Sequence, residues 1–147
     1  MLTLADHLCK PNLHAAIIPP DDLENTHEYN IWRENIFALS RLSKTYMKLS
    51  GCFSELPPIL QTASAPDILK AIQSWFIVVL TTFKPSRIMF GSDWPVCTVG
   101  VGDNAWEKWR EVVEMLCGVA GLTKEEQIML WSGTAIKAYN IEELMIW

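Results

Sequence analysis

Polar residues with acid–base chemistry stand at the ends of three short apolar or alternating runs. His7 closes the first run, Lys48 and Ser50 lie near the end of the second, and Asp93 follows the third with Trp94 beside it. A carboxylate can take a proton from water, and a histidine can act as an acid or a base. A lysine between them can neutralise an anionic group. His7 and Asp93 are therefore the candidate catalytic residues.

Each of these residues also has an ordinary structural interpretation. His7 can be hydrogen-bonded at a strand end, Lys48 can extend into solvent, and Ser50 or Asp93 can close a turn through its own side chain. Residue type and position leave both interpretations open. The choice depends on the elements that position the four side chains.

Three short strands are predicted, over residues 2–7, over residues 45–50 and in the apolar part of Arg87–Val96. Gly91 removes the side chain where the last strand ends. Pro95 cannot continue a ladder, because it has no N–H group to donate. Asp93 is therefore expected at the carboxyl end of a strand, where α/β folds build their sites.

Helices are predicted between and after these strands, because apolar residues recur there every three or four positions. The predicted helices cover residues 29–42, 64–83 and 104–120, a short helix from the Thr123–Glu126 capping box to a break at Gly133, and residues 134–139. The segments 12–28 and 53–58 are expected to be loops.

Alternation of strands with helices predicts a parallel sheet with right-handed crossovers. The carboxyl ends of parallel strands meet at one edge, and the outer two of three neighbouring strands lie about 10 Å apart. Side chains of His7, Lys48 and Asp93 that lean inward can thus contact one small substrate.

The composition is that of a single acidic globular domain over residues 1–147. Half of the residues are hydrophobic, a fifth are charged, and the net charge is −5. No basic cluster occurs, which argues against nucleic acid and membrane surfaces as partners. The longest apolar run, Trp75–Leu80, is too short to span a bilayer, and Met1–His7 lacks a signal-peptide core, so a cytoplasmic location is expected. The four cysteines have no CxxC spacing and are expected to be free thiols.

Four segments together resemble one known family. They are Ala5–Pro11 (ADHLCKP), Tyr46–Gly51 (YMKLSG), Arg87–Pro95 (RIMFGSDWP) and Ser132–Ala135 (SGTA). Their order and spacing are similar to those of the amidohydrolase-related TIM-barrel hydrolases. Within that family the chain looks most like the branch of L-fuconolactonase, L-rhamnonolactonase and 2-pyrone-4,6-dicarboxylate lactonase.

The resemblance implies that the three strands are strands six, seven and eight of a (β/α)8 barrel. It implies that Asp93 is the general base toward water; in metal-containing members the matching aspartate also binds the metal. His7 would lie beside the substrate, and Lys48 and Trp94 would be substrate-binding residues. The implied reaction is hydrolysis of a sugar-acid or related lactone, with water attacking the ring carbonyl while Asp93 takes its proton.

The chain also departs from the family. Members begin with a His-x-His pair on strand one, which occurs nowhere here, and a full barrel takes about 250 residues. We therefore expect an incomplete, C-terminal part of a barrel. No cofactor is assigned: zinc occurs in the family, but its strand-one ligands are absent. Open sheet edges predict self-association, and the alternative to a lactonase is an inactive truncated chain that acts, if at all, by association with another chain.

Overall fold

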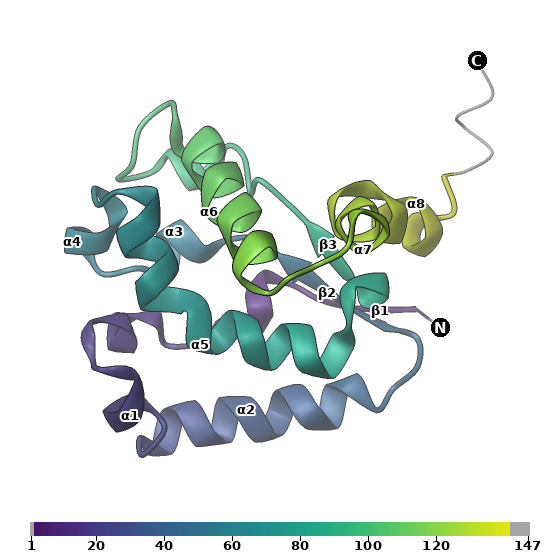
Figure 1. Ribbon diagram of the computed structural model, residues 1–147, viewed down its shortest axis with the longest axis horizontal. Coiled ribbons are helices and arrows are strands. Elements are labelled where there is room, and N and C mark those ends of the chain that lie inside the picture. The colour runs from purple at the N-terminus through teal and green to yellow at the C-terminus, as the bar shows by residue number, and fades with distance from the viewer. Residues whose placement is uncertain (1, 142–147) are drawn as a thin grey trace.

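Residues 2–141 are described by the computed structural model, and they contain a three-stranded parallel sheet (Figure 1). The strands are β1 (Thr3–Ala5), β2 (Thr45–Leu49) and β3 (Ile88–Phe90), in that order across the sheet. The predicted parallel sheet is confirmed, although each strand is shorter than the segment predicted for it.

Three long helices pack together over the sheet. They are α2 (His27–Ser40), α5 (Ala65–Phe83) and α6 (Ala105–Val119). Helix α5 contacts both of the others and lies between them (Figure 1). The predicted helices are confirmed, with α2 beginning and ending two residues before the predicted bounds.

The hydrophobic core lies between β2 and the helices. Met47 and Leu49 of β2 are completely buried, as is Val79 of α5, and Trp75 and Phe76 of α5 are nearly so. Burial alternates along β2: Thr45, Met47 and Leu49 are buried, whereas Tyr46 and Lys48, on the other face, are half-buried. No helix within residues 2–141 has the length and apolar character needed to cross a membrane.

Side-chain caps begin two of the helices as the sequence indicates. The Ser64 hydroxyl accepts the N–H of Asp67 at the start of α5. Thr123 and Glu126 form both hydrogen bonds of a capping box at the start of α7 (Lys124–Ile128). Such caps satisfy backbone donors that have no partner within the helix.

The two expected loops are partly helical. The first contains a 3₁₀ turn at Leu13–Ile17 and the short helix α1 (Pro20–Leu23). The second overlaps α3 (Cys52–Glu55) and ends at the first residue of α4 (Pro58–Gln61). A proline occupies the first helical position of both α1 and α4, where its fixed φ favours the helix and its missing N–H costs nothing. These elements are too short to show helical periodicity.

The predicted break at Gly133 is wrong. Helix α7 continues through a π-helical turn at Met129–Gly133 into α8 (Thr134–Tyr139). Gly133 has helical angles, with φ −58° and ψ −40°; glycine weakens a helix but does not force it to end. The Thr134 hydroxyl donates to the carbonyl of Pro85 at 3.0 Å, which ties this segment to the chain before β3.

Candidate active site

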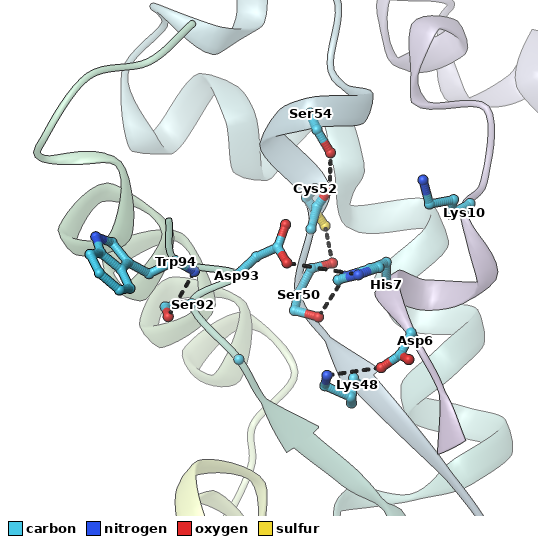
Figure 2. A network of polar contacts seen from close by, with 12 residues as sticks. Asp6, His7, Lys10, Lys48, Ser50, Cys52, Ser54, Ser92, Asp93 and Trp94 are labelled. Atoms are coloured by element: carbon cyan, nitrogen blue, oxygen red, sulfur yellow. Dashed lines mark hydrogen bonds and ion pairs between the residues drawn. The ribbon is translucent and has the colours of Figure 1, made fainter. Parts of the chain in front are cut away.

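His7 and Asp93 come together beyond the carboxyl ends of the outer strands, β1 and β3 (Figure 2). The distance from His7 Nε2 to Asp93 Oδ1 is 3.7 Å. That distance allows ionic attraction but is too long for a hydrogen bond. The two side chains are 27% and 17% exposed, so solvent and a small molecule can reach them.

His7 lies in a left-handed turn after β1 rather than in the strand. Residues 7–10 have φ of 52°, 54°, 58° and 47°. Non-glycine residues adopt this region at a cost of roughly 1–2 kcal/mol each. The indole N–H of Trp32, on α2, donates to the carbonyl of Leu8 at 2.9 Å and so holds the turn. Strain of this kind occurs preferentially at functional sites.

The other ring nitrogen of His7 faces the end of β2. Its Nδ1 lies 2.9 Å from the hydroxyl oxygen of Ser50, which is 1% exposed. The next residue, Gly51, has φ +68°, and a Cβ at that position would overlap Nδ1 of His7. Sequence reasoning placed Ser50 near the site but did not foresee this contact. The glycine directly after the serine was the only signal for it.

Asp93 sits in a tight loop after β3 with φ +61°. The backbone N–H of Trp94 donates to the Ser92 hydroxyl at 3.2 Å. The indole N–H of Trp109, on α6, donates to the Gly91 carbonyl at 3.2 Å. A tryptophan on a helix thus anchors each of the two loops, the His7 turn and the Asp93 loop. The sequence predicts Trp32 and Trp109 only as apolar residues on helix faces, and no local pattern indicates that their N–H groups bond to these loops.

Among the described residues, neither Trp94 nor Lys48 makes a side-chain hydrogen bond or ion pair with His7 or Asp93. Trp94 is 71% exposed, and its ring points away from the pair (Figure 2). The ammonium of Lys48 lies 2.9 Å from Asp6 Oδ1. This hydrogen bond is the main cause of a raised Lys48 pKa, against the opposing effect of burial. The positive charge of Lys48 is therefore already matched.

All four cysteines are free, as predicted. Cys52 and Cys97 are buried near the site, and burial raises the pKa of both thiols, with a further contribution from the negative charge of Asp93. Raised pKa values favour the neutral thiol form, which suits the buried packing positions of both side chains.

The described residues do not fit a metal ion by themselves. Within residues 2–141, no three histidine, cysteine, aspartate or glutamate side chains lie close enough together to hold one. His7 and Asp93 supply two potential donors, whereas a catalytic zinc usually takes three from the protein.

Comparisons with known proteins identify relatives of this chain. The model of the amidohydrolase family matches residues 13–141. The chain is 31% identical over 139 residues to the L-rhamnono-gamma-lactonase of Scheffersomyces stipitis, and 31% identical over 142 residues to the L-fucono-1,5-lactonase of Burkholderia multivorans. Each alignment covers 94% of this chain, but 40% and 43% of the respective lactonase.

Solved structures of amidohydrolases are similar to this chain in fold. An amidohydrolase from Burkholderia multivorans with bound HEPES superimposes with a TM-score of 0.75 at 30% identity, over 95% of this chain and 44% of that one. A crystal form of an amidohydrolase from that organism with bound zinc gives 0.74 at 31% identity, over the same shares. The chain spans about two fifths of the length of the curated relatives that it matches, and it belongs to the amidohydrolase family.

Proposed function

We propose that this chain contributes the acid–base residues of a lactone-hydrolysing site. The single observation that carries the proposal is the 3.7 Å approach of His7 and Asp93, which are 86 residues apart (93 − 7) and lie in the loops after two different strands. Two titratable side chains on one rim can divide general acid and base work. The strained turn that presents His7 supports a functional role, because such strain persists only where the surroundings enforce it.

In the proposed reaction Asp93 is the general base. Asp93 takes a proton from water as the water oxygen bonds to the ring carbonyl carbon of the lactone. The bond from that carbon to the ring oxygen then breaks. The departing oxygen takes up the proton that Asp93 accepted, either directly or through Nε2 of His7, which gives its own proton and receives that of Asp93. The product is the open-chain hydroxy acid. Positioned groups of this kind contribute about 10²–10⁴-fold to a rate.

The relatives suggest the substrate class, a sugar-acid or related lactone. Lys48 and Trp94 remain the proposed substrate-binding residues. The exposed ring of Trp94 would need to turn toward the pair to contact a substrate there. Lys48 would need to exchange its Asp6 partner for the substrate. Because Asp6 is about half exposed, such an exchange would carry little desolvation cost.

A second candidate role is association without catalysis. The described sheet leaves the outer edges of β1 and β3 unpaired, and unpaired edges offer backbone groups to another chain. A chain acting in this way would form complexes and would show no turnover.

The test of the proposed function is a screen for acid release from sugar-acid 1,4- and 1,5-lactones. The chain would be assayed alone and together with the N-terminal segment of the Burkholderia multivorans lactonase that precedes the matched region. Turnover in either sample supports the lactonase proposal. Folded protein that shows no turnover in both samples contradicts it and favours association.

A further inference from the structure

The His7 ring has a defined partner at each nitrogen. Nδ1 faces the buried Ser50 hydroxyl at 2.9 Å, and Nε2 faces the Asp93 carboxylate at 3.7 Å (Figure 2). A neutral imidazole carries one proton, so one nitrogen donates and the other accepts. The identity of the two partners decides which nitrogen does which.

The two partners are not equivalent. An ionised carboxylate only accepts hydrogen bonds, whereas a serine hydroxyl can donate or accept. A proton on Nε2 of His7 suits Asp93, and the lone pair then left on Nδ1 suits the hydroxyl of Ser50 as a donor. The opposite tautomer would turn the Nε2 lone pair toward the negative charge of Asp93.

We propose that Ser50 is a positioning residue that holds His7 in the tautomer with its proton on Nε2. This inference rests on the proposed function for its catalytic meaning, but the tautomer itself can be measured without any substrate. In the reaction it keeps the Nε2 proton of His7 aimed at the space beside Asp93, where the departing ring oxygen needs one. Wrong tautomers of catalytic histidines are known to cost large factors in rate.

The surroundings of Ser50 are built to keep this contact. Ser50 follows β2 directly, and the thiol of Cys52 lies 3.7 Å from its carbonyl as a weak donor. A Cβ at Gly91, on the neighbouring loop, would come within 3.0 Å of the Ser50 Cβ. Gly51 and Gly91 therefore together leave room for the Ser50 hydroxyl to contact the His7 ring.

Nitrogen-15 NMR of the imidazole rings tests the proposal on the whole chain. At alkaline pH, where imidazoles are neutral, the wild-type protein should show His7 protonated at Nε2 and unprotonated at Nδ1. His14 and His27 serve as references in the same spectrum. Ser50→Ala should shift the Nδ1 resonance of His7, because its donor is lost. Ser40→Ala, which removes a hydroxyl bonded within its own helix, should leave all three rings unchanged.

A wild-type His7 with its proton on Nδ1 would overturn the inference, whether or not the variants fold. So would an Nδ1 resonance of His7 that Ser50→Ala leaves in place. Neither result depends on turnover. If His7 has the expected tautomer but the chain shows no lactonase activity, the proposed function is rejected and the role of Ser50 stands. If the chain is active but His7 has the other tautomer, the role of Ser50 is rejected and the proposed function stands.

Discussion

At the scale of single residues, the site depends on how closely the backbone approaches the His7 ring. The left-handed Gly51 makes this approach possible, because any Cβ there would overlap Nδ1 of His7. Ser50 supplies the polar contact and Asp93 the charge. The chemistry of His7 is thus set by residues more than 40 positions away in the sequence.

Gly51→Ala should therefore destabilise the fold and move His7. We expect a loss of about 1–3 kcal/mol in the free energy of unfolding, since the variant adds both an unfavourable φ and an overlap. The matched control is Gly118→Ala on α6, where an added Cβ meets nothing within 4 Å. Alanine there should stabilise the helix by about 0.5–1 kcal/mol. Urea unfolding measures both, and equal stabilities for the two variants would refute the account of Gly51.

The buried thiols make stability depend on pH in the alkaline range. Burial raises the pKa of Cys52, and it raises the pKa of Cys117 to about 11. An unfolded thiol titrates near about 8.5, so the unfolded state loses these protons first as pH rises. Unfolding should therefore become easier between about pH 8.5 and 11. Urea unfolding at stepped pH measures this, and Cys52→Ala should reduce the slope; a slope that the variant leaves unchanged would contradict the assignment.

At the scale of elements, two helices fix the two loops of the site. Trp32 on α2 bonds the His7 turn through Leu8, and Trp109 on α6 bonds the Asp93 loop through Gly91. Both rings are buried, so each tryptophan joins the core to a loop backbone. The distance between His7 and Asp93 therefore depends on how α2 and α6 each pack against α5.

Trp32→Phe and Trp109→Phe should each lose one hydrogen bond while keeping an aromatic ring. We expect a cost of about 1–3 kcal/mol, because a carbonyl that is buried at Leu8 and half-buried at Gly91 is left without its donor. We also expect a change in the His7 imidazole resonances. Trp75→Phe is the control, since that ring packs edge-on against Tyr29 in the same core. Calorimetry and NMR check the prediction. A control with the same effect on the His7 resonances would show that general packing, not these two bonds, is responsible.

The elements with strong local signals could be predicted from the sequence, and those that depend on tertiary contacts could not. The start of α5 is indicated in the sequence by Ser64, Pro66 and Asp67, and the start of α7 is indicated by its capping box. No residue in the sequence indicates the left-handed turn at residues 7–10, because the turn lacks glycine and asparagine, the residue types that favour a positive φ. It is held by contacts from α2 and β2 that are distant in sequence.

For the candidate site, the sequence predicted the positions of the residues along the chain but not the directions of their side chains. Apolar runs that end in polar residues predicted His7 and Asp93 at the carboxyl ends of the two outer strands, and the structure has both residues in the loops that directly follow those strands. The pattern did not reveal that Lys48 is paired with Asp6 or that the Trp94 ring points outward. Side-chain direction in loops follows local φ and partners rather than strand alternation, and Asp93 itself has φ +61°.

At the scale of the whole molecule, the described residues form a compact layer of helices on a sheet with two open edges. The relatives are more than twice as long as the matched segment, and parallel strands are usually covered on both faces. We propose that the chain is one domain whose sheet meets further strands, from its own or another chain.

Purified chain should accordingly self-associate as its concentration rises. Unpaired edges at β1 and β3 offer N–H and C=O groups to a second copy. Size-exclusion chromatography with light scattering over a hundredfold concentration range measures the mass. A species that stays at the 16.7 kDa of a monomer throughout would refute this prediction.

The central claim is that Asp93 is the base in lactone hydrolysis, and one comparison of variants tests it most directly. Asp93→Asn and Asp103→Asn would be assayed on the lactone that gives the best turnover, in the sample in which the chain is active. Asp103 is an exposed carboxylate in the segment after the site. We expect Asp93→Asn to lower kcat by about 10²–10⁴-fold and Asp103→Asn to leave it unchanged. Equal activity of the two variants would contradict the assignment of Asp93.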